Sequence, residues 1–158
     1  MLRDLVRGQR AHRRGSGGPR WRLYETPAGN VPKDLVVMFA GIVNAQIPGS
    51  LRPALTDREV GELDAVLRFI DRHGARDLLY VTRLQGDATP VTEKVKAAKG
   101  PLIELKIRSG QNNPRFLFVV CSDVAVFLAA FKKKTRKLSR QDIDRADSRF
   151  RTMKGGCA

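Results

Sequence analysis

The sequence predicts an α+β fold, in which helices stand before and after a set of antiparallel strands. Three observations support this class. A capping box and a helical apolar stripe mark residues 56–74, period-2 alternation marks residues 102–108, and a second capping box begins at Ser139. With 158 residues, the chain is long enough for one domain with a substantial core.

The first part of the domain is expected to hold a strand and a helix. Residues 21–25 have the composition of a short strand, and turn residues follow them. Residues 32–43 carry apolar side chains at helical spacing after a proline, which suits the first position of a helix. Pro48 ends this segment, and residues 49–53 are expected to form a loop.

Two further helices have clear boundaries. Thr56 and Glu59 form a capping box, and Gly74 marks the C-terminal end of that helix. Its inner face is expected to hold Val60, Leu63, Leu67 and Ile70. A second capping box at Ser139 predicts a final helix, and the inner face of that helix holds Ile143, Ala146, Phe150 and Met153.

Three strands are predicted between these helices. Residues 102–108 alternate apolar and charged side chains, as a half-buried strand does. Residues 115–120 form a second strand after a turn, and residues 124–131 form a third that is apolar on both faces. Because the connections are short, we expect a sequential antiparallel meander.

The basic surplus is concentrated in two segments. The chain holds 30 Lys plus Arg against 16 Asp plus Glu, and this net charge of +14 favours polyanionic partners. Residues 1–22 carry seven Arg and one Asp, and residues 100–137 carry eight basic residues against two acidic ones. We expect residues 1–19 to be a disordered basic arm or the product of an upstream start codon, residues 20–154 to be the folded domain, and residues 155–158 to be a tail.

The expected meander brings basic residues from three strand ends to one edge of the sheet. The cations expected there are Lys106, Arg108, Arg115, Lys132, Lys133 and Lys134. Sheet ends also hold such residues simply because they face water. However, only Glu104 and Asp123 oppose the cations of this segment, and this imbalance favours a site that binds an anion.

Other chemistry has little support in the sequence. His12 lies in the arm and His73 at a helix end, so no metal or cofactor is expected. Cys121 and Cys157 are too few for a disulfide framework, and Cys121 is expected to be a small core residue in a reducing compartment. The longest apolar run is too short to span a membrane and no apolar signal segment follows the N-terminus, so we expect a cytoplasmic protein.

Four segments carry a family resemblance. They are the strand Leu102–Arg108, the strand start Arg115–Phe118, the run Phe127–Thr135 and the helical segment Ile143–Ala146. Together they resemble the RelE/HigB superfamily, and more narrowly the phage-derived HigB-like toxins of type II toxin–antitoxin systems. The resemblance extends over about residues 20–153.

This resemblance implies a RelE-like fold, with N-terminal helices packed on a twisted antiparallel sheet and a C-terminal helix. It implies a metal-independent endoribonuclease, an mRNA interferase, that cuts mRNA on the ribosome and inhibits translation. The cognate antitoxin is expected to be a helix-turn-helix, HigA-like protein. The resemblance assigns catalysis to Lys106, Arg115 and Lys133, and RNA binding to Arg108, Lys132, Lys134 and Arg136.

The sequence lacks one feature of many such enzymes, a Tyr or His near the end of the sheet. The last Tyr is Tyr80 and the last His is His73, and both precede the predicted strands. Either crowded lysines with a depressed pKa transfer the protons, or the chain is not catalytic. Two alternatives therefore stay open: a gyrase-inhibiting toxin of the same fold, and an RNA- or ribosome-binding protein without catalysis.

Overall fold

The computed structural model describes residues 19–43, 54–81, 84, 91–108, 112–133 and 137–157. Within these ranges the chain folds as an α+β domain with a mixed five-stranded sheet and five helices. Parts of the sequence prediction lie outside them. These parts are the basic arm up to residue 18, the loop at 48–53, the turn at 109–111, and the two cations Lys134 and Arg136.

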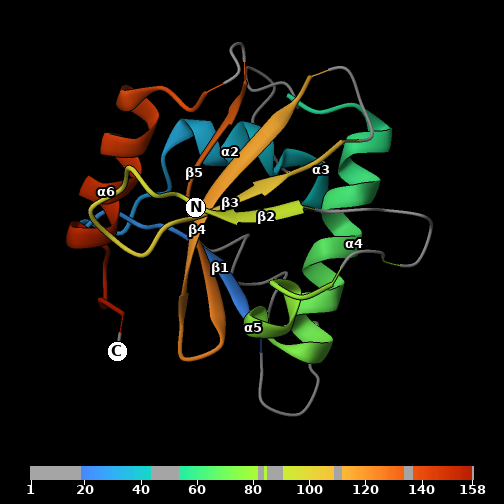
Figure 1. Ribbon diagram of the computed structural model, residues 1–158, viewed down its shortest axis with the longest axis horizontal. Coiled ribbons are helices and arrows are strands. Elements are labelled where there is room, and N and C mark those ends of the chain that lie inside the picture. Colours follow the sequence, from blue (N-terminus) through green and yellow to red (C-terminus); the bar gives the residue numbers. More distant parts are fainter. Residues whose placement is uncertain are drawn as a thin grey trace.

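The sheet has the strand order β1-β5-β4-β3-β2 (Figure 1). Its strands are β1 (Trp21–Leu23), β2 (Val91–Lys94), β3 (Ile103–Lys106), β4 (Pro114–Cys121) and β5 (Val124–Lys132). The pair β1–β5 is parallel, and the other three pairs are antiparallel. The helices are α2 (Lys33–Met38), α3 (Ala40–Val43), α4 (Asp57–His73), α5 (Ala75–Leu78) and α6 (Arg140–Thr152).

The predicted meander is confirmed by β3, β4 and β5. A two-residue turn joins β4 to β5, and both of its residues, Ser122 and Asp123, have positive φ values of 49° and 67°. Such a turn matches the natural twist of a hairpin. Asp123 also fixes α5, because its carbonyl accepts a hydrogen bond from Ala75 N and its carboxylate accepts one from Arg76 N.

The N-terminal helical segment differs from the prediction. In place of one helix over residues 32–43, α2 and α3 are separate and meet at Phe39. The Phe39 ring is fully buried and lies 5.5 Å from the ring of Phe116 and 5.2 Å from that of Phe127, measured between centroids. The break therefore turns a large aromatic side chain into the core, at the cost of one continuous helix.

Strand β2, over residues 91–94, is not among the strands that the sequence predicts. The strand is short and its side chains are half-buried or exposed. It is held by antiparallel pairing with β3, in which Val91 lies opposite Lys106 and Lys94 opposite Ile103. Pairing with β3, whose residues alternate clearly, thus stabilises a strand that its own composition does not predict.

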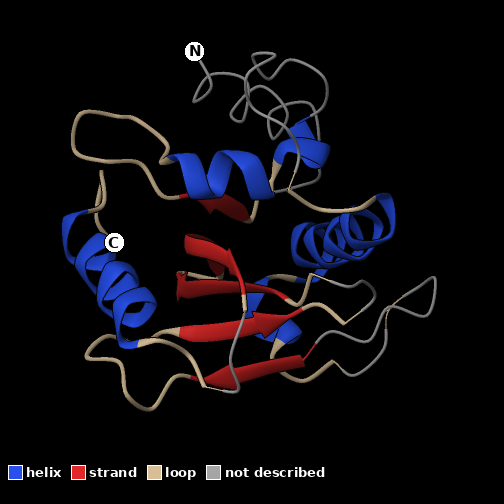
Figure 2. Ribbon diagram, turned by 90° about the horizontal axis from the view of Figure 1, so that it is seen from above, coloured by secondary structure: helices blue, strands red, loops and turns tan. Residues whose placement is uncertain are grey.

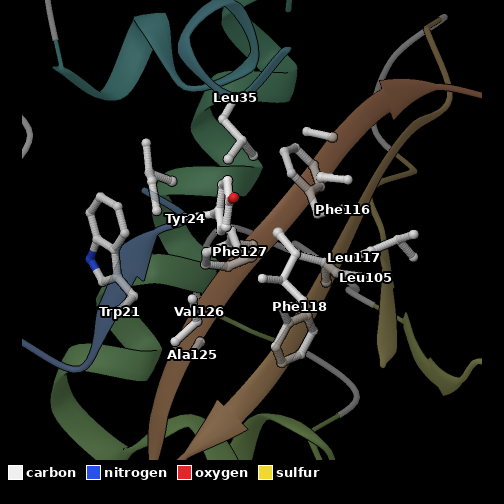
Figure 3. Packing of buried hydrophobic residues seen from close by; sticks show 14 of the residues in the cluster. Trp21, Tyr24, Leu35, Leu105, Phe116, Leu117, Phe118, Ala125, Val126 and Phe127 are labelled. Atoms are coloured by element: carbon white, nitrogen blue, oxygen red, sulfur yellow. The ribbon is translucent and has the colours of Figure 1, made fainter. Parts of the chain in front are cut away.

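Helices α4 and α6 lie on opposite sides of the sheet (Figure 2). On α4, Leu63, Leu67 and Ile70 are fully buried as predicted, whereas Val60 is only half-buried. The capping box at its start is reciprocal, with both predicted hydrogen bonds present between Thr56 and Glu59. Large rings fill the centre of the core between α2, α4 and the sheet, as Figure 3 shows for Trp21, Phe116, Phe118 and Phe127.

Strand β5 continues past the end of β1, and the ion pair between Arg149 and Asp34 covers that part of the β5 edge. Arg149 of α6 donates from Nη1 to the Leu128 carbonyl at 2.9 Å and to Asp34 Oδ2 at 2.9 Å. The same carboxylate oxygen of Asp34 accepts a hydrogen bond from Ala130 N. These contacts satisfy backbone groups beside the register shift between β4 and β5, so α2, α6 and the sheet are locked together.

The expectation of unpaired cysteines is wrong. Cys121, at the end of β4, forms a disulfide with Cys157, and their Cα atoms are 5.2 Å apart. The segment after α6 is also held by a hydrogen bond from Lys154 N to the Glu25 carbonyl. The sequence could not reveal this pair, because the pairing depends on where the last helix ends in the folded domain.

Candidate active site

The strand ends that carry the predicted cations do meet. In the sheet register, Lys106 lies opposite Arg115, and Pro114 lies opposite Lys132. Just after β5, Lys133 N donates a hydrogen bond to the Asn113 carbonyl at 3.0 Å. The ends of β3, β4 and β5 therefore converge as the meander predicted, and they bring together the three residues expected to be catalytic.

Each of the two central cations is paired with a carboxylate. Lys106 Nζ lies 2.9 Å from Glu93 Oε1, and Arg115 Nε lies 3.2 Å from Glu104 Oε2. Glu104 and Asp123 are the only acidic residues of the segment 100–137, as counted, but the unpredicted strand β2 brings in a further carboxylate, Glu93. Asp123 lies at the opposite end of the hairpin, in the turn between β4 and β5.

The Arg115–Glu104 pair is largely buried. The side chains are 14% and 7% exposed, and Arg115 Nη1 also donates to the Pro114 carbonyl at 3.0 Å. A guanidinium held by these contacts cannot rotate freely, so its N–H groups keep a fixed orientation. The pair forms the floor of the candidate site.

The Lys106–Glu93 pair is more open. Glu93 is 57% exposed and Lys106 is 22% exposed. A hydrogen bond from Lys106, the charge of Lys106 and the charges of Lys133 and Arg115 hold the pKa of Glu93 below its ordinary value. All three predicted catalytic cations thus act electrostatically on one carboxylate that the sequence analysis did not select.

The remaining predicted RNA-binding residues surround this centre unevenly. Lys132 is exposed and lies opposite Pro114, so it alternates to the other face of the sheet from Arg115. With Lys133 it lines a pocket of about 300 Å³ at the start of α6. Phe131 and Ser139 also line this pocket. Arg108 is exposed just beyond β3. Lys134 and Arg136 lie outside the described residues.

Two buried carboxylates of α4 anchor the hairpin between β3 and β4. Glu59 accepts hydrogen bonds from Asn112 N at 3.0 Å and from Asn112 Nδ2 at 2.6 Å, and Glu62 accepts one from Arg108 N at 3.4 Å. Burial opposes ionisation of Glu59. The hydrogen bonds from Thr56 and Asn112 outweigh it and hold the pKa of Glu59 below its ordinary value.

His73 and Tyr80, the described titratable residues singled out for proton transfer in the sequence, are not part of this site. His73 lies against Phe69 at the end of α4, with ring centroids 4.6 Å apart, and Tyr80 is exposed after α5. In the parts of the chain that the structure describes, no group of His, Cys, Asp and Glu side chains is suited to hold a metal ion. Nor does any helix there combine the length and apolar character that crossing a bilayer requires.

Comparison with protein families gives a match over the region that holds the site. Residues 67–151 match the model of a family described as phage-derived Gp49-like proteins (DUF891). The match extends over more than half of the chain and includes Glu93, Lys106, Arg115 and Lys133. The chain belongs to the Gp49-like family. Neither the curated proteins nor the solved structures gave a match.

Proposed function

We propose that this Gp49-like protein is the toxin of a type II toxin–antitoxin system and acts as a ribosome-dependent mRNA endoribonuclease. The observation that carries the proposal is the convergence of Lys106, Arg115 and Lys133 around the Glu93 carboxylate. Membership of a family known as toxin-like in such systems supports it. The proposed RelE-like arrangement has the cations on the sheet face that α6 borders.

The proposed reaction needs no metal. The 2′-hydroxyl oxygen of a nucleotide forms a bond to the adjacent phosphorus, and the bond from phosphorus to the 5′-oxygen of the next nucleotide breaks. The products are a 2′,3′-cyclic phosphate and a free 5′-hydroxyl. Arg115 and Lys133 stabilise the negative charge that develops on the phosphorane oxygens, and fixed charges of this kind are usually the largest catalytic contribution.

Glu93 and Lys106 take the proton-transfer role for which the sequence has no Tyr or His near the end of the sheet. In the free protein their charges satisfy each other at 2.9 Å. An RNA phosphate competes for Lys106, and as the ammonium turns to the phosphate the pKa of Glu93 rises again. Glu93 then accepts the 2′-hydroxyl proton, and one of the lysines donates a proton to the leaving 5′-oxygen.

The surrounding cations bind RNA rather than react with it. Arg108, Lys132, Lys134 and Arg136 are proposed to contact phosphates on either side of the cleaved bond. The proposed partners are translated mRNA on the ribosome and a cognate antitoxin of the helix-turn-helix, HigA-like class. Because the substrate is found there, the proposed site of action is the cytoplasm.

The proposal is tested with Lys106→Ala combined with Arg115→Ala in a reconstituted translation system. We expect cleavage of translated mRNA to fall at least about 10²–10³-fold, the cost of removing one preorganised charge. The matched control is Lys33→Ala with Arg72→Ala, which removes the same charge from exposed positions on α2 and α4. Primer extension maps the cleaved bonds, and circular dichroism verifies that both variants fold.

Three outcomes contradict the proposal in different ways. Growth arrest by the double variant without mRNA cleavage shows that the toxicity is not nucleolytic. Growth arrest accompanied by altered DNA supercoiling favours the gyrase-inhibiting alternative. A wild-type chain that sediments with ribosomes and cleaves nothing favours a binding protein without catalysis.

A further inference from the structure

The opposite face of the sheet holds a second, apolar cleft of about 540 Å³ between α5 and the strands β2 and β3. Its floor includes Leu102, Ile103 and Val120, and Leu79 is part of its wall. Tyr80, 84% exposed, stands at its rim. Large apolar surfaces of this kind on a monomer commonly mark a binding site.

Alternation along the strands separates this cleft from the candidate active site. Lys94 lies opposite Ile103 across the β2–β3 pair, and Glu93 lies opposite Glu104. Since successive residues of a strand point to opposite faces, the first pair borders the cleft and the second borders the cations. A ligand in the cleft therefore occupies the face that Lys106 and Arg115 do not.

The rim of the cleft carries one sign of charge. Arg76, Lys94 and Lys96 line it, and the lining residues that the structure describes include no carboxylate. An apolar floor with a cationic rim is complementary to an apolar surface flanked by carboxylates. A segment with leucine-like side chains on one side and glutamates beside them has this chemistry.

The walls of the cleft are fixed before any ligand binds. The Asp123 turn holds the start of α5 through Ala75 N and Arg76 N. On the other side, the buried carboxylate of Asp147 accepts hydrogen bonds from Lys99 N at 2.8 Å and Gly100 N at 2.9 Å. Because the site is preformed, ordering it when a ligand binds costs little free energy.

Charge selects among the candidate occupants. A second copy of this chain carries a net charge of +14, and its basic surface would be repelled by the rim. Nucleic acid has a negative charge that suits the rim, but its phosphates would make no favourable contact with the apolar floor. We propose that the cleft is the docking site for an acidic amphipathic segment of a partner protein. This inference rests on the proposed function, which requires a protein inhibitor, and it names where that partner binds.

The test uses two synthetic peptides of about four helical turns and identical composition, Leu and Glu. In one the leucines lie on a single helical face, and in the other they are distributed around the helix. We expect the full-length chain to bind the amphipathic isomer about ten-fold more tightly at an ionic strength of about 0.15 M, where non-specific attraction is screened. Fluorescence anisotropy measures both affinities. Methyl resonances of Leu79, Val95 and Ile103 are expected to shift on binding.

A charge-reversed variant locates the site. Lys94→Glu with Lys96→Glu is expected to abolish the preference for the amphipathic isomer. The control, Lys33→Glu with Lys154→Glu, makes the same change of charge at exposed positions outside the cleft and is expected to preserve it. Equal binding of both isomers, or loss of preference in both variants, overturns the proposal. So do resonance shifts confined to the residues around Arg115.

mRNA cleavage by the same preparations separates the two proposals. Cleavage without a peptide preference leaves the proposed nuclease standing and removes the docking site. A peptide preference that depends on Lys94 and Lys96, without cleavage by the wild type, leaves the docking site standing and removes the nuclease.

Discussion

The two faces of strand β3 have opposite character. Leu105 is fully buried on the face toward α4, whereas its neighbours Glu104 and Lys106 lie on the other face in ion pairs. Burial of a leucine contributes about 1.5–3 kcal/mol, whereas the more exposed of the two pairs, Lys106–Glu93, contributes about 0.2–1 kcal/mol. One strand thus stabilises the fold through one face and leaves the other available for chemistry.

The two faces together explain how the protein tolerates so many cations beside a core. The charges at the centre of the site are not left to repel each other, since Glu104 and Glu93 each pair with one of them. In the proposed reaction, a substrate phosphate displaces the exposed carboxylate of Glu93 from Lys106, whereas Arg115 keeps its buried partner Glu104.

Arg115→Ala is expected to have the largest effect on stability. It leaves the Glu104 carboxylate buried without its partner, and breaking a buried pair costs about 3–5 kcal/mol. Adding Glu104→Gln removes the uncompensated charge, so the double variant is expected to regain part of that stability while cleavage stays lost. Urea unfolding and mRNA cleavage measure the two quantities. Arg115→Ala unfolding at the wild-type urea concentration would show that the pair is not structural.

Cys157→Ser is expected to lower stability without affecting the chemistry. The disulfide joins residues 36 positions apart, and closing a loop of that size stabilises the native state by about 2–4 kcal/mol. Cys121 lies at the far end of β4 from Arg115, so mRNA cleavage at a temperature where the variant is folded is expected to be unchanged. Dithiothreitol is expected to reproduce the loss in the wild type and to have no effect on the variant. A drop in cleavage at full folding would instead couple the two ends of the strand.

Glu59→Gln is expected to have a smaller effect that depends on pH. The folded-state pKa of Glu59 lies below its ordinary value of 4.5, so the unfolded chain takes up a proton first as the pH falls. The stabilisation is therefore present above pH 4.5 and disappears as the pH falls through the lower folded-state value. At pH 7 the variant is expected to lose about 1 kcal/mol. Denaturation is measured at a series of pH values, with the exposed Asp77→Asn as control. The stability curves of the wild type and Glu59→Gln are expected to converge in acid; parallel curves would refute the assignment.

The strongest patterns in the sequence predicted the fold well where they were local. The Thr56 capping box, the meander over β3 to β5 and the helix from Ser139 are present with nearly the expected boundaries. Hairpin connections and caps involve residues a few positions apart, so the chain carries their signals in short segments. The convergence of Lys106 and Arg115 followed from strand direction alone.

The features that the sequence did not predict depend on distant partners. Strand β2 exists because β3 offers it a pairing edge, and only that pairing brings Glu93 to Lys106. The disulfide of Cys121 depends in the same way on the position of the last helix. The β-branched residues Val91 and Thr92 were the available local signal for β2, but two such residues are too few to distinguish a strand from a loop.

The parallel pairing of β1 with β5 has a consequence for synthesis of the chain. Trp21 lies opposite Ala125, so the partners are 125 − 21 = 104 residues apart. While a ribosome makes this protein, the first strand stays without its neighbour until most of the domain has been translated, and such long-range pairing is slow to form. The sheet, and the cationic end that depends on it, is therefore completed only after β5 has been translated. A protein proposed to attack translating ribosomes thus has no finished sheet while the residues before β5 are still being made on its own ribosome.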